Sequence, residues 1–124
     1  MLICADSWFP ESYIEAAKKD ARIILVPSYA AGNGKMAKPW SGYDGQPAPN
    51  DVNPFDIGDL TEAEAWKKYT LPGRMKAPAE LGVNVFLRGT FWNMGSDGLT
   101  QVVYRDKTAE VRQSQQDGIW NICF

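Results

Sequence analysis

The stretch Ile23-Ile24-Leu25-Val26, stopped by Pro27, decides the fold of this chain. A continuous run of β-favouring apolar residues is typical of a strand buried on both faces, as in a parallel sheet covered by helices. Residues 11–19, just before it, carry apolar side chains at the spacing of one helical face. Leu2-Ile3 looks like the stub of an earlier strand. Strand, helix and strand together predict a βαβ unit with a right-handed crossover.

Residues 30–59 form a long irregular segment that is rich in glycine and proline. Loops of this length in a compact domain are usually functional rims or disordered segments. Trp40, Tyr43 and Phe55 lie within it, and disordered segments are poor in aromatic residues. These aromatic residues therefore argue against simple disorder.

A helix is predicted to begin after Thr61. Thr61 and Glu64 have the spacing of a capping box, in which each side chain accepts a hydrogen bond from the other residue's backbone N–H group. Glu64 and Lys68 are placed to form an i,i+4 ion pair. Leu71-Pro72-Gly73 breaks this helix, and a short helical turn is expected to follow, as far as Met75.

The tail of the chain is predicted to be β-structure. Residues 83–88 alternate well enough for a strand. Residues 100–105 and 109–113 flank Asp106-Lys107-Thr108 and predict a hairpin, and residues 119–124 predict a last strand. Together with the βαβ unit, this pattern predicts a single α/β domain with a mixed sheet.

Composition excludes several classes of function. The chain has 13 basic and 15 acidic residues with no lysine and arginine cluster, so we expect no nucleic-acid partner. It has no apolar run of membrane-spanning length and no recognisable signal peptide, so we expect a cytoplasmic protein without membrane contact. It has no histidine, which excludes Ser-His-Asp and Cys-His mechanisms within the chain. Two cysteines without histidine do not make a zinc site, so we expect reduced thiols and no cofactor.

Cys4 is the candidate nucleophile. It follows the predicted strand stub and precedes the predicted helix of residues 11–19. A cysteine on a tight turn between strand and helix faces free backbone N–H groups, which stabilise a thiolate or an oxyanion. The position of Cys4 favours a reactive cysteine, but most free cysteines are small buried apolar residues. From the residues alone, the two interpretations are equally supported.

The segment Leu2-Ile3-Cys4-Ala5-Asp6-Ser7-Trp8-Phe9-Pro10-Glu11 resembles the nucleophile motif of the nitrilase superfamily of carbon–nitrogen hydrolases. In that motif an apolar strand ends in cysteine, an acidic residue follows two positions on, and Phe-Pro-Glu opens the next helix. The resemblance continues into Val26-Pro27-Ser28. Residues 82–89 and Gly95-Ser96-Asp97-Gly98 look like the later strand and glycine-bounded turn of the family's C-terminal half. It covers nearly the whole chain, though residues 30–59 only loosely.

This resemblance implies the C-terminal half of an αββα sandwich with a mixed sheet. It also implies a Glu-Lys-Cys hydrolase, in which Cys4 attacks an amide carbon, or less commonly a nitrile carbon, and forms a thioester-type intermediate. A glutamate moves protons and activates water, while a lysine stabilises the developing charge. In the family both lie upstream of the cysteine, where this chain has only Met1, Leu2 and Ile3. Residues 1–124 are therefore expected to be a partial domain that is inactive alone.

Candidate substrate contacts are the neighbours of the nucleophile, Ala5, Ser7 and Trp8, together with Tyr29, which leaves the following strand. Ligands of open parallel sheets bind at the carboxyl ends of the strands, where these residues are expected to lie. Trp8 and Tyr29 are equally explained as packing residues. Asp6 is expected to shape the turn rather than to act as a base.

Two other functions compete with that of a hydrolase fragment. A non-catalytic module of the same fold would bind an amide-like ligand or mediate dimerisation, without turnover. A thiol-reactive protein that uses Cys4 for redox or acyl transfer is less well supported, because no resolving cysteine lies nearby. An isolated half-sandwich would expose one side of its sheet, so we expect a homo-oligomer or a partner that covers the missing half. Three tryptophans are expected in a core or an interface rather than in a binding site: Trp66, Trp92 and Trp120.

Overall fold

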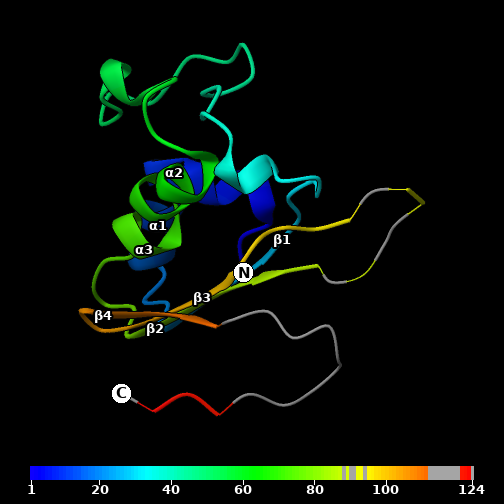
Figure 1. Ribbon diagram of the computed structural model, residues 1–124. Coiled ribbons are helices and arrows are strands. Elements are labelled where there is room, and N and C mark those ends of the chain that lie inside the picture. The colour runs from blue at the N-terminus through cyan, green and yellow to red at the C-terminus, as the bar shows by residue number, and fades with distance from the viewer. Residues whose placement is uncertain (88, 90–91, 94, 112–120, 124) are drawn as a thin grey trace.

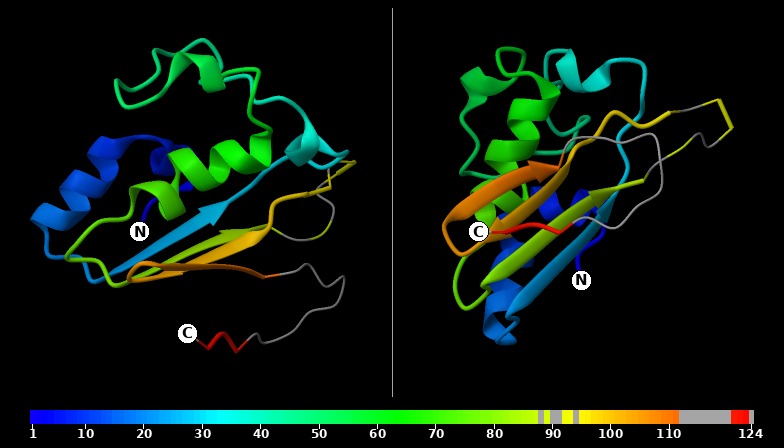
Figure 2. Two further views of the ribbon diagram at one scale, coloured as in Figure 1. Left: turned by 60° about the vertical axis from the view of Figure 1, so that its left-hand side comes forward. Right: turned by 60° about the horizontal axis from the view of Figure 1, so that its bottom comes forward.

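A four-stranded mixed sheet forms one layer of the protein, and helices cover one of its faces (Figures 1 and 2). The computed structural model describes residues 1–87, 89, 92–93, 95–111 and 121–123. Strand β1 (Ile23–Ser28) pairs in parallel with β2 (Leu81–Phe86). Strand β3 (Thr100–Tyr104) lies antiparallel to β2, and β4 (Lys107–Val111) lies antiparallel to β3. The predicted α/β class with a mixed sheet is confirmed.

The helical layer consists of α1 (Pro10–Lys18), α2 (Glu62–Tyr69) and α3 (Leu71–Arg74). Three 3₁₀ turns accompany them: η1 (Cys4–Trp8), η2 (Lys35–Ala37) and η3 (Pro54–Asp56). The predicted capping box begins α2, because Glu64 N–H donates to Thr61 Oγ1 at 3.3 Å and Thr61 N–H donates to Glu64 Oε2 at 2.8 Å. In the described ranges, no helix is both long enough and apolar enough to cross a membrane.

The start of the chain differs from the prediction. Leu2 N–H donates to the carbonyl of Leu25 at 3.0 Å, but residues 1–3 form no strand, since one backbone hydrogen bond does not make a ladder. Residues 4–8 then form η1 before α1 begins. The parallel connection of the sheet is instead the one from β1 to β2, which passes through α2 and α3.

Only one face of β1 is buried. Ile24, Val26 and Ser28 point toward the helices, whereas Ile23 and Leu25 are 57% and 49% exposed. The prediction of a strand buried on both faces is therefore wrong for the described part of the chain, because the helices cover only one side of the sheet. The second side also exposes apolar residues of the neighbouring strand and its continuation, Val85 and Leu87. We call Ile23, Leu25, Val85 and Leu87 the open sheet face.

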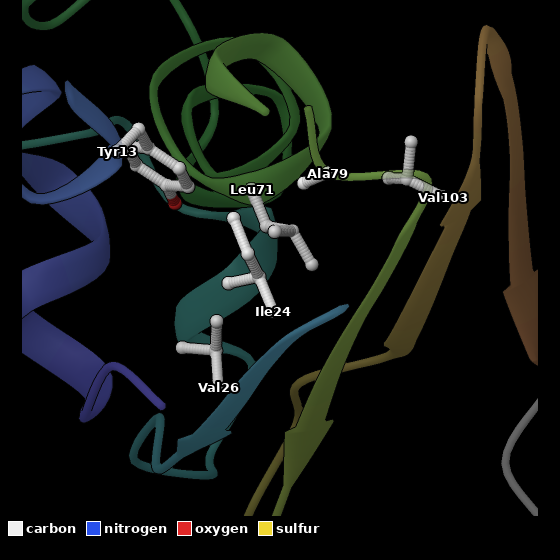
Figure 3. Close-up of a cluster of buried hydrophobic side chains, with 6 residues drawn as sticks. All are labelled: Tyr13, Ile24, Val26, Leu71, Ala79 and Val103. Atoms are coloured by element: carbon white, nitrogen blue, oxygen red, sulfur yellow. The ribbon is translucent and has the colours of Figure 1, made fainter. Parts of the chain in front are cut away.

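The main hydrophobic core lies between α1, α3 and the sheet. Figure 3 shows Ile24 and Val26 of β1 directed toward Leu71 of α3 and Tyr13 of α1. A side chain at Gly82 of β2 would lie 2.9 Å from a methyl of Leu71, which means that α3 packs almost on the strand backbone. This close approach sets the packing distance between α3 and the sheet.

The long segment before α2 is ordered around Trp40, whose side chain is 1% exposed. Trp40 packs with Val52, Ala65 and Tyr69, and its backbone N–H donates to Leu60 at 2.8 Å. The aromatic residues thus anchor most of this segment as expected, although Phe55 is 86% exposed.

The hairpin turn begins one residue earlier than predicted and is shorter, at Arg105-Asp106, because Lys107 and Thr108 already pair with β3. Arg105 adopts a φ of 55°, which closes the tight turn. The predicted last strand lies mostly outside the described residues, and residues 121–123 are not in a strand.

Two side-chain predictions are corrected by tertiary contacts. Lys68 forms its ion pair with Asp56 at 2.6 Å and not with Glu64, whose carboxylate caps Thr61. Trp92 is 79% exposed, so of the two roles expected for it the core is wrong, and the interface stays a prediction. Trp66 is buried as expected, at 4% exposure, and Trp120 lies outside the described residues.

Candidate functional site

Cys4 opens the turn η1 with a φ of 39°, a backbone conformation that non-glycine residues rarely adopt. Such conformations cluster at functional sites, where the surrounding structure holds them in place. Two hydrogen bonds stabilise this conformation of Cys4. Ile3 N–H donates to Asp6 Oδ2 at 3.0 Å, and Ser7 Oγ donates to the Cys4 carbonyl at 2.6 Å. The prediction that Asp6 shapes the turn is confirmed.

The thiol of Cys4 lies at the carboxyl end of β1. Its Sγ donates to the carbonyl of Tyr29 at 3.6 Å, and the side chain is partly exposed. Two of the predicted site residues are thus brought together at the edge of the sheet where parallel folds bind ligands. Cys4 precedes α1 as predicted, and the rest of η1 together with Phe9 lies between it and Pro10.

Ser7 is fully buried and holds η1 against α1. Its hydroxyl is bonded to Cys4, and its carbonyl accepts a hydrogen bond from the Tyr13 hydroxyl at 3.0 Å. Burial raises the pKa of Tyr13 well above its ordinary value, so the phenol remains a donor at physiological pH. Ser7 therefore holds the turn that carries Cys4 from its buried side. Ala5, the other neighbour of Cys4, is exposed.

Trp8 belongs to an aromatic cluster. Its ring stacks on Trp40 with centroids 5.6 Å apart and meets Trp66 edge-on at 4.8 Å. Its carbonyl accepts hydrogen bonds from the Tyr43 hydroxyl at 3.0 Å and from Arg74 Nη1. These contacts attach η1 to α2 and to the loop before it, which is the packing role that the sequence left open for Trp8.

Tyr29 ties the end of β1 to the segment before β3. Its hydroxyl donates to the carbonyl of Gly95 at 3.3 Å, and Gly32 N–H donates to the same carbonyl at 2.7 Å. A side chain at Gly32 would lie 2.8 Å from the backbone of Gly95, so this contact requires glycine. The Tyr29 side chain is partly buried beside the Cys4 turn.

A pocket of about 430 Å³ opens next to this turn, between α2, η2 and the start of β3. Trp66 and Phe86, whose rings meet edge-on at 4.8 Å, line it. Cys4 packs against the cluster of Ala30, Trp66 and Phe86, two members of which line the pocket, whereas Cys4 itself is not among the lining residues. The complete lining, which we call the Trp66 pocket, is Gly34, Met36, Ala37, Ala63, Trp66, Phe86, Asp97, Leu99, Gln101 and Glu110.

The sequence did not reveal this pocket, because its residues come from separate segments. The alternation of residues 83–88 was the available signal for Phe86, since it places that side chain inward at the end of a strand. No local pattern indicated that Met36 and Gln101 would line the same pocket as Phe86. Trp66 was expected to be buried, and it both fills the core and lines the pocket.

Glu62 is a buried carboxylate that contacts Trp66. It is 8% exposed, and its Oε1 accepts a hydrogen bond from Trp66 Nε1 at 3.2 Å. Burial raises the pKa of Glu62, while the charge of Lys35 and the Trp66 hydrogen bond oppose this shift. The nearest carboxylates in sequence are placed differently: Glu11 is exposed, and Glu15 is ion-paired with Lys18 at 2.7 Å.

Within the described part of the chain, the hydrogen bond of the Cys4 thiol goes to a backbone carbonyl, not to a carboxylate or an amine. Lys35 and Lys38 are exposed, as expected. Cys4 and Cys123 are both free thiols. Among the described residues, no group of three or more histidine, cysteine, aspartate or glutamate side chains is placed to hold a metal ion.

Comparison with protein-family models, with curated proteins and with solved structures found no match to this chain. The site must therefore be interpreted from its own geometry.

Proposed function

We propose that this chain is the nucleophile-bearing half of a cysteine-dependent hydrolase that cleaves non-peptide C–N bonds, of the nitrilase type. The observation that carries the proposal is the backbone of Cys4, held at a φ of 39° by Asp6 and Ser7 at the carboxyl end of a parallel strand. A core cysteine does not need such a conformation, whereas a nucleophile on a tight turn does. The substrate is a small amide, with a nitrile as the less favoured alternative.

The chemistry proceeds in two steps. Cys4 Sγ gives up its proton and attacks the amide carbonyl carbon; the C–N bond breaks, and the amine leaves with one proton. The resulting thioester on Cys4 is then attacked by water, which releases a carboxylic acid and restores the thiol. A general base is needed in both steps, and a cation stabilises the tetrahedral oxyanion.

The base and the cation are proposed to come from a second layer that covers the open sheet face. Four apolar residues are exposed there, and contiguous exposed apolar surface marks an interaction site. The occupant supplies a glutamate and a lysine to Cys4 and completes an αββα sandwich. A second copy of the chain or a separate partner would fill this place.

An acyl-transfer experiment tests the role of Cys4 without needing complete turnover. The purified chain is mixed with p-nitrophenyl acetate, whose good leaving group requires no general acid. We expect a burst of nitrophenolate, one equivalent per chain at most, followed by a stall, because water attack on the thioester lacks its base. Intact-mass analysis and peptide mapping locate the acetyl group.

Cys123 provides the matched control, since it is an exposed free thiol without a strained backbone. Cys4→Ala is expected to abolish the burst, and Cys123→Ala to leave it unchanged. Two outcomes would refute a nucleophile role for Cys4. In the first, Cys123 is acetylated as fast as Cys4; in the second, Cys4 is acetylated no faster in the folded chain than in urea.

The second candidate is a non-catalytic ligand-binding module of the same fold. It is favoured by the Trp66 pocket together with the lack, in the described part of the chain, of a carboxylate or amine bonded to Cys4. It predicts small-molecule binding that Cys4→Ala leaves unchanged, with no acylation burst.

A further inference from the structure

The Trp66 pocket has walls of two distinct kinds. Most of its lining is apolar or aromatic, including Met36, Trp66 and Phe86. Its charged lining residues are both acidic, Asp97 and Glu110. A concave apolar site with a few convergent polar groups is the usual form of a small-molecule site, and its volume of about 430 Å³ lies in the range that such sites occupy.

The two acidic residues differ in their charge balance. Glu110 is ion-paired with Lys67 at 3.0 Å, so its charge is compensated. Asp97 forms no ion pair within the described residues, and its Oδ2 is buried without a hydrogen-bond partner. A buried carboxylate oxygen without a donor is costly, and such groups usually mark a place where a further partner binds.

A buried amide pair adds to this polar end of the pocket. Gln101, which lines the pocket, is 2% exposed, and its Oε1 accepts a hydrogen bond from Asn84 Nδ2 at 3.3 Å. Asn84 is fully buried, and its Oδ1 has no partner in the structure. Of the lining residues, Asp97 thus offers a buried oxygen acceptor without a donor, which favours a ligand that donates hydrogen bonds.

We propose that the Trp66 pocket binds a small organic ammonium ion, with its apolar body against Trp66, Phe86 and Met36 and its cationic head toward Asp97. The charge of the ligand compensates Asp97, and the aromatic walls bury its apolar body. An anionic ligand of the same size is repelled by Asp97, whose charge no ion pair compensates within the described residues. Binding of this ligand does not depend on whether Cys4 is catalytic.

A consequence for substrate choice does rest on the proposed function. Cys4 packs against the hydrophobic cluster of Ala30, Trp66 and Phe86, so the proposed nucleophile and the pocket border the same cluster. The amide nitrogen of a substrate is uncharged before cleavage, so the cation must be a separate amine group of the same molecule. The proposed substrates are therefore amides that carry a cationic amine group next to an apolar body.

The test is a binding measurement with three probes that share one phenyl body. Phenethylammonium, 2-phenylethanol and 3-phenylpropanoate differ chiefly in the charge of the head group. We expect phenethylammonium to bind at least about tenfold more tightly than the alcohol, and the carboxylate not at all, by calorimetry at neutral pH. Equal binding of the three probes, or no binding of phenethylammonium, would overturn the proposal.

Three variants locate the site. Asp97→Asn keeps the shape of the side chain and is expected to remove the preference for the cation, while Ala63→Leu, which fills the pocket from α2, is expected to remove binding altogether. Ala37→Leu fills it from η2 and replaces Ala63→Leu if that variant does not fold. Unchanged cation binding in Asp97→Asn, with circular dichroism that shows a folded chain, would place the ligand elsewhere and refute the assignment.

Two controls separate this inference from the proposed function. Cys4→Ala is expected to bind phenethylammonium as the unmodified chain does, even if Cys4 proves not to be a nucleophile. Glu15→Gln removes an exposed carboxylate on α1 and is expected to change nothing, whereas a loss of binding like that of Asp97→Asn would show non-specific attraction to the acidic chain and overturn the site.

Discussion

The thiol of Cys4 lies 3.6 Å from the backbone carbonyl oxygen of Tyr29, although 25 residues separate them in the chain. This contact places the candidate nucleophile at the carboxyl end of β1. Tyr29, the residue after β1, also donates its hydroxyl hydrogen to the carbonyl of Gly95. The position of Cys4 is thus defined by two elements at once, the turn η1 and the end of a strand. Such double support is what a strained residue requires to keep one conformation.

The first prediction concerns the backbone strain at Cys4. Glycine adopts a positive φ without the steric penalty that a Cβ atom brings, so Cys4→Gly is expected to be more stable than Cys4→Ala by about 1 kcal/mol. Urea denaturation of the two variants measures the difference. At Ala5, next in the turn, the order is expected to reverse, with Ala5→Gly less stable than the unmodified chain. Equal stability of the two Cys4 variants would contradict a strained turn.

The second prediction concerns Ser7, the buried hydroxyl that holds the nucleophile turn. Ser7→Ala removes the donor to the Cys4 carbonyl and is expected to lower the free energy of unfolding by about 1 kcal/mol. Because the turn loosens, acetylation of Cys4 by p-nitrophenyl acetate is expected to slow. Ser41→Ala, at an exposed serine in the long loop, serves as the control and is expected to change neither quantity.

The third prediction concerns the start of α2, which presents Ala63 and Trp66 to the pocket. Thr61→Ala removes the N-cap acceptor of the capping box and is expected to cost about 1 kcal/mol of stability. Thr61→Ser keeps a capping hydroxyl and is expected to lose less. Thermal unfolding followed by circular dichroism ranks the variants, and a Thr61→Ser as unstable as Thr61→Ala would argue against the cap.

The fourth prediction concerns pH. The pKa of Glu62 is raised by burial, so the folded state binds its proton more tightly than the unfolded state does. Its contribution to stability is therefore fully present below the ordinary glutamate pKa, and it is lost as the pH rises through the raised value. Glu62→Gln keeps an acceptor for Trp66 Nε1 and is expected to be more stable than the unmodified chain at neutral pH, but not in acid.

Glu64 is the matched control, since it lies in the same helical turn and its pKa shifts the other way. Hydrogen bonds from Thr61 lower the pKa of Glu64, so its contribution is present above the ordinary glutamate pKa and is lost as the pH falls through the lowered value. Glu64→Gln is expected to be less stable than the unmodified chain at neutral pH. Urea denaturation across the acid range gives both profiles, and parallel profiles for the two variants would contradict the assignment.

The fifth prediction concerns the open sheet face. Leu25 is 49% exposed there, so Leu25→Lys is expected to change the stability of the single chain by no more than about 0.5 kcal/mol. The same change is expected to break any association through this face, as measured by analytical ultracentrifugation. Ile14→Lys places the same charge at a 51% exposed residue of α1 and is expected to leave the association intact. If both variants and the unmodified chain sediment as the same oligomer, the interface lies elsewhere.

Local signals in the sequence were sufficient for three of the elements, although the strand predicted at Leu2-Ile3 does not form. The apolar run of residues 23–26 predicted β1, the capping box at Thr61 predicted α2, and Pro10 with the helical periodicity after it predicted α1. Each of these signals acts through neighbours a few residues away, so the chain carries it wherever it folds. The conformation of Cys4 is different: its positive φ depends on contacts of Asp6 and Ser7 within the turn, which spacing alone does not specify.

The tertiary structure alone decided which surfaces are buried and which residues meet. An apolar strand has the same sequence whether one or two layers cover it, so the exposure of Leu25 could not be predicted from the run it belongs to. Lys68 forms its ion pair with Asp56, because the packed loop before α2 places that carboxylate within reach, whereas Glu64 caps Thr61. The Trp66 pocket combines residues from η2, α2 and three strands or their ends, and no sequence period joins such segments. Packing against distant residues, which is long-range in the chain, determines the site, whereas the sequence determines the elements that carry it.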